Sequence, residues 1–192
     1  MRGLLIVDIQ NDFTEGGALG VTGGAQVARD VTAYLAAHAD DYDLVLASRD
    51  WHDADNDNGG HFAVEGAPNF VDTWPVHCVA GTDGAEYHAE LDTSRVDIHI
   101  KKGQGEPSYS MFEGVSDNGE TVADILTSHG ITEVDVVGIA TDHCVRASAL
   151  DALGAGQKVT ILTDLIAAVA PDTGETALEE LATRGAALQT SS

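Results

Sequence analysis

The sequence predicts an α/β fold, a single domain in which a parallel β-sheet is flanked by helices on both faces. Short apolar runs of strand type alternate along the chain with segments whose apolar residues recur at helical spacing. Residues able to do chemistry stand at or just past the ends of four strands, where open parallel sheets place their sites. At 192 residues the chain can bury one sizeable core, so we expect one domain over residues 1–192.

The first half of the chain contains two apolar runs around a helical pattern, followed by a long polar stretch. Apolar residues recur at helical spacing at Val27, Val31 and Leu35. The histidine-bearing stretch over 49–91 is too long for an ordinary connection, so we expect it to be functional. The regular elements expected here are a strand over 3–8, a helix over 23–39 and a strand over 43–48.

The second half alternates regularly between strands and helices. Residues 96–101 alternate apolar and polar side chains in the manner of a strand. The runs around Val136 and Ile161 are mostly apolar, which indicates buried strands. The expected elements are strands over 96–101, 134–140 and 158–162, helices over 121–129, 142–153 and 173–184, and a short last strand over 186–188.

Charge and composition exclude several classes of partner. The chain carries 9 Lys and Arg against 32 Asp and Glu, a formal net charge of -23, so its surface repels nucleic acid and anionic membranes. No apolar run approaches the roughly 20 residues that span a bilayer, and Asp8 interrupts the N-terminal run, unlike in a signal peptide. We expect a cytoplasmic monomer or small homo-oligomer without a disulfide framework. A bridge between Cys78 and Cys144 stays an open alternative.

Cys144 follows the expected strand over 134–140 and falls in the first turn of a helix. If Thr141 is the N-cap, Cys144 is the third helical residue, among backbone N–H groups without partners in the helix. These groups favour thiolate over thiol. A free cysteine is more often a small buried apolar group, but this position favours a nucleophile. Cys78 lacks both features and is interpreted as structural.

Asp8 closes an apolar strand, a costly place for a carboxylate unless it is paired or has a chemical role. Such a residue can be a loop-binding aspartate. Beside a thiol, it could take the thiol proton and later return it to a leaving amine. A nearby lysine would keep it ionised. Lys101 and Lys102 point to opposite faces of a strand, so only one can serve, and periodicity alone does not choose.

A second group of residues has the composition of a metal site. In an extended segment Asp50 and His52 lie on one side, about 7 Å apart, close enough to share a cation. His61 and His77 would join them from the long polar stretch. One carboxylate and three imidazoles suit a single divalent Zn, Fe or Mn ion, so the ligands do not name the metal. The alternative is that loop histidines are simply solvated.

Three aromatic residues, Phe13, Trp74 and Tyr109, are expected in loops near the strand ends where the predicted site lies. Core packing is the ordinary use of such side chains. A flat aromatic substrate would provide a second use, because ring faces hold another ring in a preferred geometry.

Four segments of the chain together resemble one known family. They are the segments over 6–13, 49–52, 74–78 and 137–145, with the sequences IVDIQNDF, RDWH, WPVHC and VGIATDHCV. In this order they resemble nicotinamidase/pyrazinamidase, a branch of the isochorismatase-like cysteine hydrolases. The resemblance extends over nearly the whole chain, and its motifs are specific as a set.

The resemblance implies roles for particular residues. Its catalytic triad falls on Asp8, Lys102 and Cys144, and the spacing from the lysine to the motif over 112–114 favours Lys102 over Lys101. The segment between His52 and His61 is longer than is typical of the family. The remaining implied features are metal ligands at Asp50, His52, His61 and His77, a cis peptide bond at Ile139–Ala140, oxyanion donors at the amides of Ala140 and Cys144, and ring contacts from Phe13 and Trp74.

The implied function is metal-dependent hydrolysis of nicotinamide to nicotinate and ammonia through a thioester, with pyrazinamide as a further substrate. One alternative is a related amidohydrolase that acts on another small amide or ureido compound. The metal set argues against it, because metal-free members of the family need no such cluster. The other alternative is a non-catalytic metal-binding module, against which the set of Asp8, Lys102 and Cys144 argues.

Overall fold

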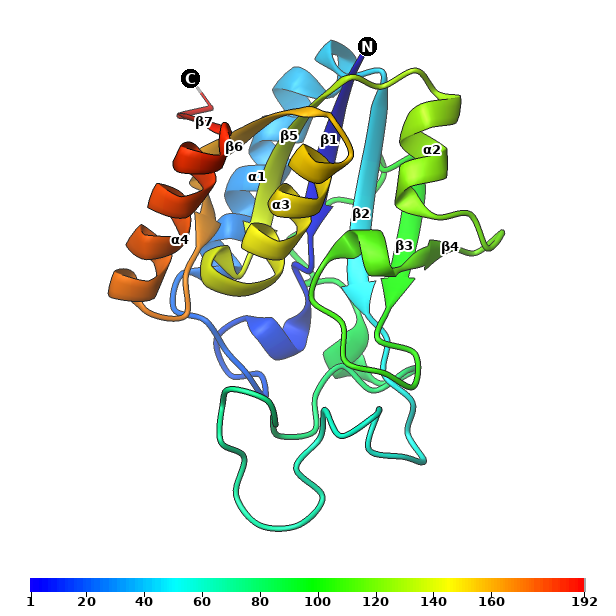
Figure 1. Cartoon of the computed structure of the whole chain (residues 1–192), viewed down its shortest axis with the longest axis vertical. Coiled ribbons are helices and arrows are strands. Elements are labelled where there is room, and N and C mark those ends of the chain that lie inside the picture. Colours follow the sequence, from blue (N-terminus) through cyan, green and yellow to red (C-terminus); the bar gives the residue numbers. More distant parts are fainter. Residues whose placement is uncertain (192) are drawn as a thin grey trace.

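A seven-stranded sheet forms the centre of the computed structural model, which describes residues 1–191 (Figure 1). The strand order is β4-β3-β2-β1-β5-β6-β7, and neighbours are parallel except for the pair β3 and β4. This confirms the predicted α/β class. The strands are β1 (Arg2–Val7), β2 (Leu44–Asp50), β3 (Ile98–Lys102), β4 (Val115–Ser116), β5 (Glu133–Ile139), β6 (Lys158–Ala167) and β7 (Ala187–Gln189).

Helices cover both faces of this sheet, as predicted (Figure 1). The four are α1 (Gly24–His38), α2 (Val122–Ser128), α3 (Arg146–Gly154) and α4 (Pro171–Arg184). Alternate residues of β1 enter two separate cores. Leu5 and Val7 share a core with apolar residues of α2, α3 and α4, whereas Leu4 and Ile6 share the other with α1. None of the helices within residues 1–191 is long and apolar enough to cross a membrane.

Several strand boundaries differ from the expected ones because the pairing partner decides them. Strand β2 continues to Asp50, and β3 runs from Ile98 to Lys102 rather than over 96–101, since Asp50 and Lys102 are register partners. Strand β6 extends to Ala167, because it pairs with β5 again beyond a bulge. The two-residue strand β4 was not predicted, since it is too short to show a periodic pattern.

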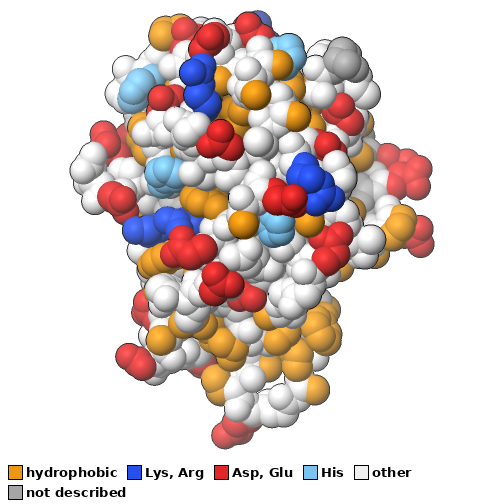
Figure 2. All heavy atoms as spheres, turned by 180° about the vertical axis from the view of Figure 1, so that it is seen from behind, with side chains coloured by type: hydrophobic (Ala, Val, Ile, Leu, Met, Phe, Trp, Pro, Cys, Tyr) orange, Lys and Arg blue, Asp and Glu red, His pale blue; other side chains and the backbone are white. Residues whose placement is uncertain are grey.

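The segment over 51–97, between β2 and β3, wraps below the carboxyl ends of the strands (Figure 1). It contains one 3-10 turn, Asp83–Ala85, and is tied together by isolated bridges that pair His52 with Val79 and Phe62 with Trp74. Figure 2 shows hydrophobic side chains gathered at this end of the molecule. The exposed large hydrophobic residues of the segment are Val64, Phe70, Val71 and Val76.

Candidate active site

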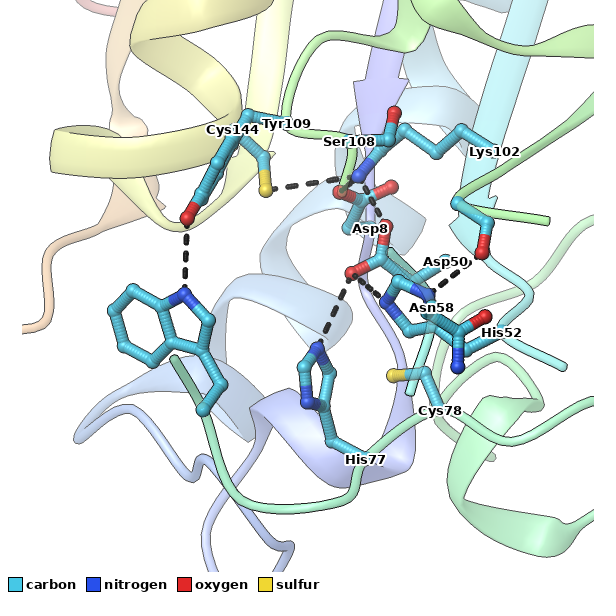
Figure 3. Close-up of polar contacts among 12 residues, drawn as sticks. Asp8, Asp50, His52, Asn58, His77, Cys78, Lys102, Ser108, Tyr109 and Cys144 are labelled. Atoms are coloured by element: carbon cyan, nitrogen blue, oxygen red, sulfur yellow. Dashed lines mark hydrogen bonds and ion pairs between the residues drawn. The ribbon is translucent and has the colours of Figure 1, made fainter. Parts of the chain in front are cut away.

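Side chains from four strand ends meet at one edge of the sheet (Figure 3). Asp8 directly follows β1, Asp50 and Lys102 are the last residues of β2 and β3, and Cys144 lies in the turn after β5. Because Asp50 and Lys102 are register partners in parallel strands, their side chains leave the sheet on the same side. Asp8 has a φ of 46°, where the chain turns out of β1. The structure thus brings together the residues that were predicted to converge from the ends of the strands.

Lys102 contacts all three of the other residues. Its Nζ lies 2.9 Å from Oδ2 of Asp8 and 3.7 Å from Sγ of Cys144, and it also contacts Oδ1 of Asp50. The Lys102 side chain is fully buried, which for a lysine requires such compensation. Lys101 points the other way and forms an ion pair at the surface. Of the two lysines that periodicity left open, Lys102 is the one in the site.

Burial disfavours the ionised form of both Asp8 and Asp50, but the pKa values of the two carboxyl groups shift in opposite directions. At Asp50 the Lys102 ammonium and the neighbouring imidazoles outweigh burial and hold the pKa well below its usual value. At Asp8 burial dominates and raises the pKa, with Lys102 and a hydrogen bond from Ser48 acting against it. Burial also lowers the Lys102 pKa, but the two carboxylates outweigh it and raise that pKa well above normal. Asp8 is therefore the group suited to exchange a proton.

The turn that carries Cys144 begins one residue earlier than expected. It is a π-helical turn, Thr141–Val145, and its N-cap is Ala140, whose carbonyl oxygen accepts hydrogen bonds of 3.1 Å from two amides of the turn. The expectation that Thr141 is the N-cap is wrong, because Thr141 already lies inside the turn. The peptide bond Ile139–Ala140 is cis, as the family resemblance implied.

The protonation state of Cys144 also differs from the expectation. Burial raises the pKa of the thiol well above its usual value, and Lys102 lowers it only in part, while Asp8 and Asp50 raise it further. Desolvation therefore outweighs the local preference of a helix start for an anion. The resting group is a thiol, so a nucleophilic role requires a base close by.

A close approach of two strands places this turn beside Asp8. Gly138 in β5 has a φ of 120°, and a Cβ atom there would lie 2.1 Å from the carbonyl oxygen of Val7. Only glycine allows the contact. It brings the chain that leads to Cys144 against the end of β1.

The predicted metal ligands form a second, adjoining cluster. The nearest ring nitrogens of His52, His61 and His77 all lie within 4.8 Å of one another, and the three side chains are buried. Oδ2 of Asp50 lies 3.6 Å from Nε2 of His52 and 3.7 Å from Nε2 of His77. Asp50 thus turns one oxygen to Lys102 and the other to the imidazoles.

Hydrogen bonds orient two of these rings toward the centre of the cluster. Nδ1 of His52 donates to the carbonyl oxygen of Gly103 at 2.7 Å, and Nδ1 of His77 donates to that of Pro75 at 2.8 Å. With the Nδ1 atom as donor, an imidazole that binds a metal offers the lone pair of its Nε2 atom. A Cβ atom at Gly103 would lie 2.5 Å from the His52 ring, so glycine is required there.

The cluster has donor atoms that nothing in residues 1–191 satisfies. Nε2 of His52 and Nδ1 of His61 are buried there without a hydrogen-bond partner. Burial and the two neighbouring imidazoles lower the pKa of His61 to about 4, which leaves the ring neutral near pH 7. Neutral imidazoles with free lone pairs beside a carboxylate are the donor set of a divalent transition-metal ion.

A cavity of about 420 Å³ has both clusters in its wall, with Cys144 on one side and Asp50, His61 and His77 on the other. Its size suits a small organic ligand. The three aromatic residues predicted to hold substrate, Phe13, Trp74 and Tyr109, all line it. Further lining residues that were not predicted are Leu19, Val21, Phe70 and Val169, which lie in loops, and His143 in the π-helical turn.

The aromatic part of the cavity wall is held in place by polar and ring contacts. Nε1 of Trp74 donates to the hydroxyl oxygen of Tyr109 at 2.9 Å. The ring of His143 packs edge-on against Trp74, with centroids 5.4 Å apart, and the ring of Phe13 packs against His77 at 5.6 Å. Such a wall favours a flat aromatic ligand.

Gln10 and Asp12, two residues of the loop after β1 that were not predicted to matter, hold Asp50 and the segment next to His77 in place. The buried side chain of Gln10 donates to the carbonyl oxygen of Asp50 at 2.9 Å and accepts from the amide of Asp50 at 2.8 Å. Oδ2 of Asp12 accepts from the amide of Cys78 at 2.7 Å. Their signal in the sequence is a run of polar residues directly after a buried strand.

Asp142 makes a similar connection on the opposite side of the cavity. Its carboxylate accepts hydrogen bonds from the amides of Val169 at 3.0 Å and Ala170 at 3.3 Å, and from the hydroxyl group of Thr173. It thereby ties the turn that carries Cys144 to the start of α4, where α4 lacks a side-chain cap of its own.

Both cysteines are free and buried, so the alternative of a Cys78–Cys144 bridge is not realised. Burial raises the pKa of the Cys78 thiol well above normal, and its Sγ lies 3.9 Å from the carbonyl oxygen of Gly84. These contacts agree with the structural interpretation of Cys78.

Comparison with known proteins connects this geometry to one family. The family described as the isochorismatase domain matches residues 2–192. The chain is 50% identical to the nicotinamidase/pyrazinamidase of Mycobacterium tuberculosis over 192 residues, which cover both chains completely.

Two solved structures are similar over nearly the whole chain. The pyrazinamidase of Pyrococcus horikoshii in complex with zinc has a TM-score of 0.84 and 38% identity, with 98% of each chain covered. The PnC1 protein of L. infantum in complex with nicotinate has a TM-score of 0.84 and 36% identity, with 100% of this chain and 93% of the other covered.

Proposed function

The chain belongs to the isochorismatase family, and we propose that it is a nicotinamidase that converts nicotinamide to nicotinate and ammonia and also hydrolyses pyrazinamide. The observation that carries the proposal is the meeting of Asp8, Lys102 and Cys144 beside three buried imidazoles under one cavity with aromatic walls. The 50% identity to a nicotinamidase/pyrazinamidase over the full length supports the substrate.

In the first half of the reaction, Asp8 takes the proton of the Cys144 thiol. The thiolate sulfur then attacks the carboxamide carbon and forms a tetrahedral oxyanion, which the backbone amides of Ala140 and Cys144 stabilise. When this intermediate collapses, Asp8 gives its proton to the leaving nitrogen. Ammonia departs and a thioester to Cys144 remains.

In the second half, water attacks the thioester carbon and Asp8 accepts a proton from it. The carbon–sulfur bond breaks, and the sulfur recovers a proton from Asp8. The carboxylic acid so formed gives its own proton to solvent and leaves as nicotinate. Lys102 stays charged throughout because the Asp50 carboxylate faces it whether or not Asp8 holds a proton, so it steadies the anionic states of Asp8 and of the sulfur.

We further propose that Asp50, His52, His61 and His77 hold one divalent metal ion. Two unpartnered buried nitrogens and a carboxylate oxygen support this set. Zn, Fe and Mn all suit such ligands. When bound, the ion would supply a Lewis acid that orients the pyridine ring and a water molecule. Phe13, Trp74 and Tyr109 would hold the ring by its faces and edges.

The surface charge and the free thiols of the protein support a proposal for its cellular location and its partners. Two free cysteines are in keeping with a reducing cytoplasm, and a formal charge of -23 disfavours nucleic acid as a partner. The partner that the cavity suits is a small aromatic amide.

An ammonia-release assay on nicotinamide, with other small amides and ureido compounds in parallel, run with and without a chelator, tests the proposal. We expect ammonia release from the metal-loaded protein, strong inhibition by the chelator, and recovery on return of the metal. Release that is insensitive to the chelator, or that occurs only with another small amide or a ureido compound, indicates a related amidohydrolase. Metal binding without any ammonia release indicates a non-catalytic module. Either result contradicts the proposed function.

A further inference from the structure

The two carboxylate oxygens of Asp8 have different surroundings. Oδ1 accepts a hydrogen bond of 2.7 Å from the hydroxyl group of Ser48, and Oδ2 lies 2.9 Å from Nζ of Lys102. Apart from that ion pair, Oδ2 is a buried oxygen without a hydrogen-bond partner within the described part of the chain. Oδ1 is therefore held by a neutral hydroxyl group, whereas the polar contact of Oδ2 is its ion pair with Lys102.

The hydroxyl group of Ser48 is buried in the sheet next to Asp8, to which it donates its hydrogen bond. It lies in β2, is 0% exposed, and pairs in register with Ile100 of β3. The final torsion of an aspartate side chain is soft, so a carboxylate held at one oxygen only could rotate about its last bond. The Ser48 hydroxyl on Oδ1 and the Lys102 ammonium on Oδ2 together fix how the carboxylate is turned.

We propose that Ser48 is a positioning residue for proton transfer, whose hydroxyl group holds the Asp8 carboxylate so that Oδ2 is presented to the Cys144 thiol. The inference rests on the proposed function, because it assigns Ser48 a part in the step in which Asp8 acts as base. Ser48 itself touches neither substrate nor the sulfur in this account.

The hydrogen bond from Ser48 also affects the pKa of Asp8, which other charged groups surround. Lys102 faces it from β3, Asp50 from β2 and Cys144 from the turn after β5. Burial raises the pKa of Asp8, and the hydrogen bond from Ser48 works in the opposite direction. Without that bond more Asp8 is protonated at a given pH. The acid limb of the pH profile of kcat/KM then moves to higher pH. On the plateau above this limb Asp8 is ionised in both proteins, so the rate there depends only on how the carboxylate is oriented.

The test compares three metal-loaded variants with the unmodified protein in nicotinamide hydrolysis over a range of pH. Ser48→Ala removes the hydroxyl group, and Ser48→Thr keeps it on a side chain suited to a strand. Ser116→Ala is the matched control, because Ser116 is also a buried strand serine, and its oxygen accepts from the amides of Asn118 and Glu120 beside the edge strand β4. Metal content and thermal melting are measured for each.

For Ser48→Ala we expect a plateau kcat about 10- to 100-fold lower, as for the loss of a hydrogen bond to a charged group. KM should change by no more than about twofold, because the substrate contacts remain. Ser48→Thr should recover most of kcat, and Ser116→Ala should retain it. A plateau kcat of Ser48→Ala within about twofold of the unmodified protein overturns the inference, as does a folded, metal-loaded Ser48→Thr no better than Ser48→Ala. If the unmodified protein releases no ammonia, the proposed function itself fails.

Discussion

Replacing Lys102 by methionine removes the one cation that the structure places between Asp8 and Asp50. The ammonium lies 2.9 Å from Oδ2 of Asp8 and also contacts Asp50, and all three side chains are almost completely buried. Without it, two carboxylates share a desolvated site with no counter-charge when metal is absent. Removal of one member of a buried ion pair typically costs about 3–5 kcal/mol, and we expect Lys102→Met to lose stability in that range near pH 7 in the presence of a chelator.

The pH dependence of this loss has a definite sign. In the unmodified protein the pKa of Asp50 is held well below normal, so its stabilisation is present above the unfolded pKa and is lost only as pH falls through the folded value. In Lys102→Met the carboxyl groups bind protons more tightly when folded than when unfolded, so stability falls as pH rises. The difference between the two proteins should therefore be largest near neutrality and shrink toward about pH 4.

Chemical denaturation of both proteins at several pH values measures this effect, and Lys101→Met is the matched control. Lys101 is the next residue, and its ion pair with Asp117 lies at the surface, so the control should lose no more than about 1 kcal/mol. In the metal-loaded protein we expect Lys102→Met to lower kcat about 10²- to 10³-fold. Equal stability of the two lysine variants, or a difference that does not change with pH, would show that Lys102 does not compensate the buried carboxylates.

Three further outcomes follow from other contacts of the site. Chelation should abolish most ammonia release, and addition of Zn, Fe(II) or Mn should restore it; full activity in protein that is metal-free by elemental analysis would contradict the cluster's role. Trp74→Phe loses the hydrogen bond to Tyr109, so steady-state kinetics should show KM raised about 2- to 10-fold with kcat little changed; an unchanged KM would argue against that wall as a substrate contact. Asp142→Asn should lower the free energy of unfolding by about 1 kcal/mol at pH 7. Because hydrogen bonds outweigh burial and lower the Asp142 pKa, this difference should disappear as acid protonates the native carboxylate, and a gap that persists in acid would contradict the assignment.

The ends of β1 and β5 could be predicted from the sequence to within one residue because local patterns mark them. An apolar run that closes on Asp8, and a strand followed by Cys144, are visible in the chain itself. The choice between Lys101 and Lys102 was not accessible in this way. It depends on where β3 ends against β2, and the register with Asp50 decides it. Only the family resemblance favoured Lys102 beforehand.

Features that arise from tertiary packing could not be predicted. The start of a helix after β5 suggested a thiolate at Cys144, but burial among groups from three other strands reverses the direction of its pKa. Ser48 carries no signal, since a serine inside an apolar strand looks like any other small residue until its neighbour in β1 is known. The histidines at 61 and 77 were suggested by ligand type, and the folding of a long loop brings them to His52.

The central claim is that Cys144 is the nucleophile, and the two free cysteines of the chain allow a direct test. Ammonia release from nicotinamide is measured for Cys144→Ala and Cys78→Ala, with metal content determined for both. We expect Cys144→Ala to keep its metal and release no ammonia, whereas Cys78→Ala should release it at nearly the rate of the unmodified protein. Full activity in Cys144→Ala would contradict the covalent mechanism.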